Sequence, residues 1–256
     1  MKIIVSIKEV PVRDSQLRIS ADGRWIEDGD LGYEMNEPDA YALEEALQLK
    51  EKHGGEVIAL CAGPPGAART IREALAKGAD RALHIEDEKI SSWDTLGLAR
   101  LLAKAVEPEK PDLILTGLQS DDLGYGQTGV VLAEILGLPH ATIIMAAEIQ
   151  DGTIRVKREL ESGWFQNIEM PLPAVLTIQS GINKLRYATL MGIKKAKTKE
   201  LKALAASDLG VVASTTASIE RIYSPQKEKQ TQLLTGSARE AAAKLVEKLR
   251  FEVRVL

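Results

Sequence analysis

Strand-like and helix-like segments alternate four times in the first half of this chain. Buried strands are predicted at the short apolar runs 3–7, 57–60, 81–85 and 113–116. Helices are predicted at the amphipathic or alanine-rich runs 40–52, 67–76, 92–106 and 127–136. Asn36 is expected to be the N-cap of the first helix, with Glu37 and Pro38 in its first turn, and residues 16–34 are expected to form a hairpin. Such alternation at short spacing is typical of an α/β fold with a doubly wound, mostly parallel sheet and right-handed crossovers.

The pattern changes after Pro139. Four β-like segments follow at residues 142–148, 153–160, 163–169 and 174–178, with turns at Asp151-Gly152 and Ser162-Gly163. They predict an antiparallel extension of the sheet. From Gly181 the periodicity is weak for about fifty residues, before a last helix at 238–250. We therefore predict a nucleotide-binding α/β domain over 1–180, and a loop and arm over 181–256 that lie on another chain.

Composition excludes several classes of protein. The 256 residues carry a net charge of −4, which argues against nucleic acid as a partner. A single cysteine and three scattered histidines give neither a disulfide framework nor metal-ligand spacing. The chain starts directly with a strand and has no apolar run long enough to span a bilayer. A cytoplasmic, not membrane-spanning, protein without a metal site is expected.

One loop carries most of the functional signal. The segment 117–128, GLQSDDLGYGQT, follows a predicted strand and precedes a predicted helix. Ligands bind at the carboxyl ends of strands in open parallel sheets, and a helix N-terminus favours phosphate. Glycines let the backbone approach a ligand, and Thr128 adds a hydroxyl donor. The same residues also fit an ordinary solvated turn, so the pattern alone leaves both interpretations open.

The sequence holds no recognisable catalytic group. The loop has neither the Walker lysine nor a G-x-G-x-x-G fingerprint. Asp121 and Asp122 are adjacent, so their carboxylates diverge, and no serine elbow with histidine and aspartate is present. Any nucleotide is expected to be held rather than turned over. The tryptophans Trp25, Trp93 and Trp164 are assigned to packing.

Several segments, in order, point to one family. They are NEPDAYALEEALQLKEK (36–52), IREALAKGADRALHI (71–85), VKRELESGWFQNIEMPLPAVLTI (156–178) and GINKLRYATLMGIKKAKTK (181–199). Along its whole length the chain resembles the electron transfer flavoprotein β-subunit family. The resemblance implies the adenine nucleotide alpha hydrolase-like fold and a heterodimer with an α subunit. It also implies an electron carrier, not an enzyme, with one FAD shared between the subunits.

The resemblance further implies a structural AMP in this chain. The positions that correspond to the family's AMP contacts are Ser6, Asn36, Glu37, Pro38, Asp39, Ala62, Gly117, Leu118, Gln119, Ser120, Asp121, Asp122, Leu123, Gly124, Tyr125, Gly126, Gln127 and Thr128. Ala62 stands where other members have a cysteine, so only its backbone is expected to take part. Residues 124–126 depart from the more acidic, amide-rich stretch of mitochondrial members, whereas 127–129 are kept.

Two alternatives to this function differ in the nucleotide held. Bifurcating relatives hold a second FAD in place of AMP and oxidise NADH, but they have a small or apolar residue where this chain has Thr128. Thr128 is similar to the AMP type that serves bacterial acyl-CoA or amine dehydrogenases. An alternative of another class is a stand-alone ATP-binding sensor domain. The long C-terminal arm and the lack of a triphosphate loop argue against it.

A second site is expected at residues 186–191. The segment 181–199 resembles the family's partner-recognition loop, and the resemblance implies that Arg186, Tyr187, Leu190 and Met191 contact the partner dehydrogenase. The heterodimer then passes electrons to a quinone-linked oxidoreductase. Leu190 is flanked by polar and basic residues, as in an exposed hot spot with a polar rim. By its pattern alone, Leu190 fits packing on its own domain better than an exposed binding position.

Overall fold

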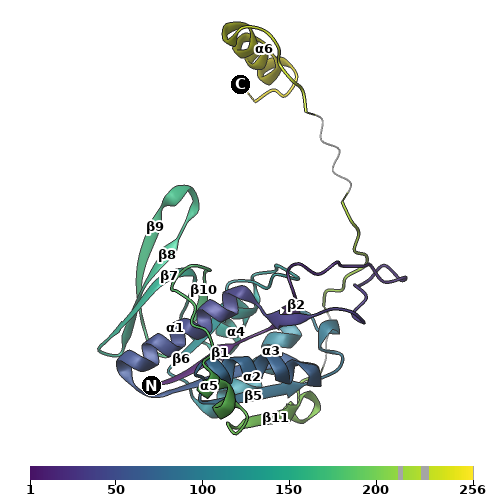
Figure 1. Cartoon of the computed structure of the whole chain (residues 1–256). Coiled ribbons are helices and arrows are strands. Elements are labelled where there is room, and N and C mark those ends of the chain that lie inside the picture. Colours follow the sequence, from purple (N-terminus) through teal and green to yellow (C-terminus); the bar gives the residue numbers. More distant parts are fainter. Residues whose placement is uncertain (213–215, 226–230, 256) are drawn as a thin grey trace. The chain divides into compact units, whose positions relative to one another are not determined.

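The predicted parallel strands lie side by side in one large sheet. The computed structural model describes residues 1–212, 216–225 and 231–255. In this described part, nine strands pair in the order β11-β5-β4-β1-β6-β10-β7-β8-β9 (Figure 1). Their bounds are β1 Lys2–Ser6, β4 Glu56–Gly63, β5 Arg81–Glu86, β6 Leu113–Gly117, β7 His140–Gln150, β8 Thr153–Glu159, β9 Phe165–Pro171, β10 Ala174–Ile178 and β11 Leu201–Ala205. From β11 to β7 every pair is parallel, so those strands share one carboxyl edge.

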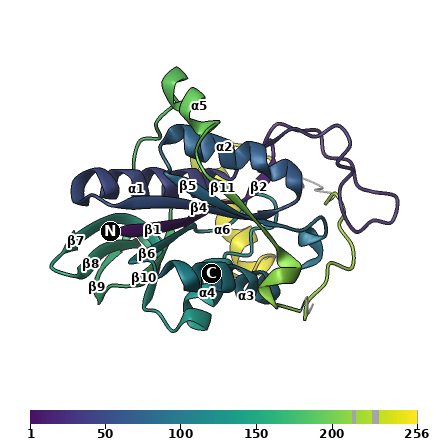
Figure 2. The same ribbon diagram turned by 90° about the horizontal axis from the view of Figure 1, so that it is seen from below.

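Helices cover both faces of this sheet, which confirms the doubly wound architecture. The helices α1 (Glu37–His53), α2 (Ala68–Lys77) and α5 (Leu190–Ala196) lie on one face, and α3 (Thr95–Val106) and α4 (Thr128–Leu136) lie on the other (Figure 2). Successive side chains of β1 point to opposite faces of the sheet and therefore pack in different core clusters. Ile3 packs with the cluster of α1 and α2, whereas Ile4 packs with the cluster of α3 and α4.

The placement of residues 174–178 in the antiparallel extension is wrong. β10 lies between β6 and β7 and is parallel to both. All five of its residues are buried, as expected for a strand covered by helices on both faces. The chain therefore returns to the middle of the sheet after the extension. Although β10 follows β9 in the sequence, the two strands are not neighbours in the sheet.

The rest of the extension agrees with the sequence. β7, β8 and β9 pair antiparallel, and their long hairpins project from the body of the sheet (Figure 1). The turns fall at the predicted positions, where Asp151, Gly152, Ser162 and Gly163 all have positive φ. Asp and Gly tolerate this left-handed backbone better than most residues, which explains why the turns were readable.

Two local predictions need correction, and a third is confirmed. The segment 16–34 is not a regular hairpin: it forms one isolated bridge, Ile19–Ile26, and is closed at its base by β2 (Glu9–Pro11) and β3 (Tyr33–Met35). Helix α3 begins at Thr95 rather than 92, because the Asp94 carboxylate accepts from the Gly97 amide at 2.7 Å and caps it. Helix α1 begins at Glu37, directly after Asn36, as the sequence predicted.

The segment after Gly181 contains more regular structure than its sequence indicated. α5 packs on α2, and β11 adds an edge strand beside β5, so this part belongs to the first of two units, Met1–Glu220. The second unit, Arg221–Leu256, contains α6 (Ala238–Phe251), which confirms the predicted last helix. A capping box between Ser237 and Glu240 starts α6.

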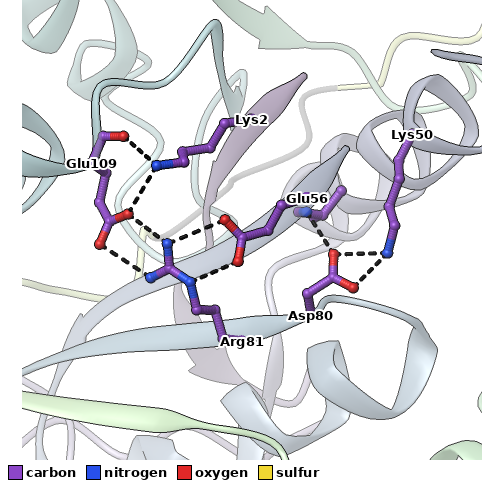
Figure 3. Close-up of polar contacts among 7 residues, drawn as sticks. Lys2, Lys50, Glu56, Asp80, Arg81 and Glu109 are labelled. Atoms are coloured by element: carbon purple, nitrogen blue, oxygen red, sulfur yellow. Dashed lines mark hydrogen bonds and ion pairs between the residues drawn. The ribbon is translucent and has the colours of Figure 1, made fainter. Parts of the chain in front are cut away.

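A charged network ties the amino edge of the sheet (Figure 3). Arg81 on β5 binds Glu56 on β4 at 2.8 Å and also pairs with Glu109, which precedes β6. The Lys2 ammonium on β1 donates to the Glu109 carbonyl at 2.6 Å. Beside them, Asp80 pairs with Lys50 and accepts from the Val57 amide. The charged side chains of this edge therefore join neighbouring strands to one another.

Candidate functional site

A cavity of about 740 Å³ opens at the carboxyl edge of the sheet. It lies where β1, β4 and β6 end and α4 begins, as expected for a ligand site in an open α/β sheet. The predicted nucleotide residues that line it are Ser6, Asn36, Asp39, Ala62, Gly117, Leu118, Gln119, Ser120, Asp122, Leu123, Tyr125, Gly126, Gln127 and Thr128. Glu37, Pro38, Asp121 and Gly124 lie outside the lining. The fold thus brings four separate predicted segments to one hollow.

Asn36 holds the loop 117–128 instead of capping a helix. It occupies the N-cap position of α1, but its side chain makes no capping hydrogen bond. Its amide donates to the Gln119 carbonyl at 2.9 Å, and its oxygen accepts from the Asp121 amide at 2.9 Å. Asn36 is 1% exposed, so both bonds are shielded from water. The predicted N-cap role of the side chain is wrong, because the loop competes successfully for both of its polar atoms.

Asp39 joins two strand ends beneath the cavity. Its carboxylate accepts from the Lys8 amide at 2.8 Å and from the Gly117 amide at 2.9 Å. Burial raises the pKa of the Asp39 carboxyl to about 7, although both amide bonds act in the opposite direction. Gly117 has no space for a side chain, since a Cβ there would overlap the Asp39 carboxylate. Gly117 is therefore required by close packing on α1.

Lys8 places a positive charge beside the loop. Its ammonium lies 2.6 Å from the Asp122 carboxylate and 3.4 Å from the Ser120 hydroxyl. Lys8 lines the cavity, two residues past the end of β1. Asn36, Asp39 and Lys8 together hold residues 117–122 from three directions. The loop is therefore shaped by its surroundings and is not a free surface turn.

The far end of the loop leads into α4. Gln127 and Thr128 line the cavity, and Gln127 at the N-cap position makes no side-chain cap, so the amides of the first turn lack that partner. Gly129 packs against β6 and β10, where a Cβ would come within 2.6 Å of Thr116 Oγ1 and Thr177 Cγ2. Thr128 and the amides of this turn have the donors that a phosphate requires.

The cavity is lined by more residues than the sequence predicted. An apolar part of the cavity is lined by residues of the segment 16–34 and of the segment that leads into α3. These residues are Trp25, Ile26, Leu31, Ile90, Trp93 and Leu98. Trp93 is fixed by a 3.0 Å bond from Nε1 to the Asp87 carboxylate. The assignment of Trp25 and Trp93 to packing alone missed this position. No motif marks them, because they come from segments that only the fold brings together.

The predicted recognition residues lie away from the cavity, at the start of α5. Tyr187, Leu190 and Met191 are 93%, 81% and 62% exposed. Arg186 differs from them, because its guanidinium pairs with Glu44 at 2.7 Å and Glu51 at 2.7 Å on α1. Leu190 does not pack into the core of its own unit, which rules out the structural alternative for that side chain.

The part of the chain that the structure describes has neither a metal-ligand cluster nor a membrane-spanning helix. Within residues 1–212, 216–225 and 231–255, no cluster of three or more His, Cys, Asp and Glu side chains has the arrangement of a metal site. No helix of the described chain is sufficiently long and apolar to cross a bilayer. Cys61 is buried in the core, and burial raises the pKa of its thiol to about 12.

Comparison with known proteins identifies the family of this chain. The family model for the electron transfer flavoprotein domain matches residues 24–209. The chain is 36% identical over 257 residues to the electron transfer flavoprotein subunit beta of Methylophilus methylotrophus, covering 96% of this chain and 97% of the relative.

The chain belongs to the electron transfer flavoprotein β-subunit family. It is also 37% identical to the subunit beta of Bacillus subtilis, with 95% and 96% coverage. The human subunit beta is 35% identical, with 98% and 97% coverage. As a member of this family the chain is a subunit of an electron transfer flavoprotein, and the sequence resemblance is confirmed over the nine-stranded unit that carries the cavity.

Proposed function

We propose that this chain is the β subunit of a heterodimeric electron carrier. The heterodimer takes electrons from an acyl-CoA or amine dehydrogenase and delivers them to a quinone-linked oxidoreductase. FAD, shared with an α subunit, supplies the redox chemistry of such a complex. This chain contributes binding surfaces and has no turnover of its own. Family membership supports the carrier role, and the exposed recognition residues support the dehydrogenase contact.

The cavity is proposed to hold AMP. The observation that carries this proposal is that residues 6, 36, 39 and 62 and most of the loop 117–128 line one cavity of about 740 Å³. That volume suits a small-molecule ligand. The first turn of α4, with Thr128, offers donors for the phosphate, while Asn36, Asp39 and Lys8 keep the loop in shape. These bonds hold the site in shape within the chain itself, which suits a structural rather than an exchanging nucleotide.

The exposed side chains Tyr187, Leu190 and Met191 are proposed to contact the dehydrogenase. An apolar anchor on a polar surface is the usual form of a binding hot spot. Lys194, Lys195 and Lys197 are exposed around it and suit an acidic rim on the partner. We propose an indirect role for Arg186. Its ion pairs with Glu44 and Glu51 hold the loop on α1, so its effect on docking is indirect.

The Arg221–Leu256 unit is proposed to pack on the α subunit. Leu245, Val246 and Phe251 of α6 are 48%, 47% and 68% exposed, and none of the described residues of α6 is buried. An amphipathic helix with an open apolar face requires a partner to bury it. The α subunit is the partner implied by the family.

A nucleotide count tests the proposal. The chain is co-expressed with its α partner, the purified heterodimer is denatured, and the released nucleotides are separated by chromatography. One FAD and one AMP per heterodimer are expected. Two FADs without AMP would move the protein to the bifurcating class. A chain that is stable alone and retains ATP would support the sensor domain instead.

A conservative substitution then locates the AMP. Thr128→Val removes only the hydroxyl of the first α4 turn and is expected to speed the loss of AMP on dialysis about tenfold, because hydrogen bonds to charged groups contribute about 1.5–3 kcal/mol. Thr142→Val on β7 makes the same chemical change away from the cavity and serves as the control. Equal retention of AMP in both variants would place the phosphate elsewhere.

A further inference from the structure

The short helix α5 is held against the C-terminal end of α2. Gly192 is the closest point, where an added Cβ would overlap the Ala76 carbonyl oxygen. Ala196, at the other end of α5, is buried in the core cluster of α1 and α2. An isolated helix of seven residues does not form in water, because nucleation is unfavourable. The existence and direction of α5 therefore depend on its contact with α2.

Two cations cap the ends of these helices reciprocally. Arg72 on α2 donates through Nη1 to the carbonyls of Ala196, at 2.6 Å, and Lys199, at 2.8 Å, just past α5. In return, the Lys199 ammonium donates to the carbonyls of Leu75, at 2.9 Å, and Ala79 at the end of α2. The last carbonyls of a helix lack intrahelical partners, and a cation there also interacts favourably with the helix dipole.

These caps lie at the C-terminal end of the helix whose N-terminal turn carries the exposed recognition residues. Leu190 and Met191 form the first turn of α5, while the second turn ends at the carbonyls that Arg72 binds. Both cationic side chains are partly buried, and burial lowers the pKa of the Lys199 ammonium. The capping bonds are thus partly shielded from water, where hydrogen bonds are stronger. On the other side of the loop, Asn183 donates to Glu45 on α1 at 3.1 Å.

We propose that Arg72 and Lys199 are positioning residues for partner docking. They do not touch the dehydrogenase but fix α5 on the body of the subunit, so that Leu190 and Met191 are presented in one direction. The inference rests on the proposed docking function of Leu190. Its physical basis is pre-organisation: a docking surface ordered in advance loses less conformational entropy on binding.

Hydrogen exchange tests the positioning directly in the purified heterodimer. Arg72→Gln removes the charge that caps α5 and is expected to speed exchange of the α5 amides at least tenfold. Arg72→Lys keeps a cation that can reach the same carbonyls and restores part of the protection. Lys77→Gln is the matched control, because Lys77 is on α2 but pairs within its own helix, with Glu73 at 2.8 Å. Unchanged exchange in Arg72→Gln would overturn the proposal.

A double-mutant cycle links the positioning to docking. Reduction of the heterodimer by a medium-chain acyl-CoA dehydrogenase, with octanoyl-CoA as reductant, is measured against heterodimer concentration. Arg72→Gln is expected to raise KM several-fold with unchanged kcat, and to have no further effect when Leu190 is already Ala. Additive effects, or a wild-type KM for Arg72→Gln beside a raised KM for Leu190→Ala, would overturn the positioning role alone. An unchanged KM for Leu190→Ala would instead overturn the docking function.

Discussion

At the scale of single residues, Asp39 makes stability depend on pH. Burial raises the pKa of its carboxyl from about 3.8 to about 7 in the folded chain. Below pH 4 the group is protonated in both states; between pH 4 and 7 only the folded state keeps the proton. The free energy of unfolding should therefore fall by a few kcal/mol as pH rises through this window, and level off above pH 7. Thermal denaturation across pH 4–8 measures this.

The variant Asp39→Asn isolates that contribution. An amide does not titrate, so the difference in stability between wild type and variant should shrink steadily from pH 4 to pH 7. The variant should also be less stable at pH 4, because its NH₂ group faces the Lys8 or Gly117 amide. A difference that stays constant over the whole range would contradict the assignment to Asp39.

Gly117 provides a second test at this scale. Gly117→Ala inserts a methyl group against Asp39 and the Pro38 Cβ and is expected to destabilise the protein by about 2 kcal/mol, as overpacking does. Gly66→Ala is the matched control, since its Cβ would meet nothing within 4 Å. That control should change stability by no more than about 0.5 kcal/mol. Urea denaturation of both variants compares them, and equal effects would refute the packing argument.

At the scale of elements, the loop 117–128 depends on α1. Asn36→Ala removes both side-chain bonds to residues 119 and 121, and we expect at least tenfold faster hydrogen exchange over 118–124 together with a loss of about 2 kcal/mol in unfolding free energy. Gln119→Ala is the control, because Asn36 binds only the main-chain carbonyl of that residue. Equal exchange in the two variants would show that other contacts hold the loop.

The elements also show where sequence patterns were sufficient. Apolar runs and glycine turns identified β1, β4, β5 and β6 and the turns of the projecting hairpins, because period and turn chemistry are local properties. The position of β10 was misjudged, since strand order is set by long-range packing. α5 and β11 were missed because a short helix and an edge strand acquire their stability from α2 and β5.

At the scale of the whole molecule, we expect the first unit to fold without the second, and the second unit to bind the α subunit. Deletion of Arg221–Leu256 is expected to leave the melting temperature of the nine-stranded unit within about 3 °C of wild type, because each unit has its own internal contacts. Binding to the α subunit should fall at least a hundredfold, since the apolar face of α6 is lost. Co-purification with the tagged α subunit measures this.

A point variant distinguishes the loss of the apolar face of α6 from the loss of the whole C-terminal unit. Leu245→Asp places a charge on the exposed apolar side of α6 and should weaken assembly as the deletion does. Lys248→Gln removes only an i,i+4 pair with Glu252 at 2.9 Å and serves as the control. Full assembly by the deletion variant would show that the α subunit binds the first unit alone.

The sequence by itself determined the family, the α/β class, the loop 117–128 and the segments that reach the cavity, because these depend on residue order and local pattern. The tertiary structure decided which contacts the individual side chains make. Asn36 holds a loop rather than a helix end, Arg186 turns inward to Glu44, and Trp25 and Trp93 share one cavity. Each of these contacts joins residues far apart in the chain, and their energies depend on burial, which only the packed fold provides.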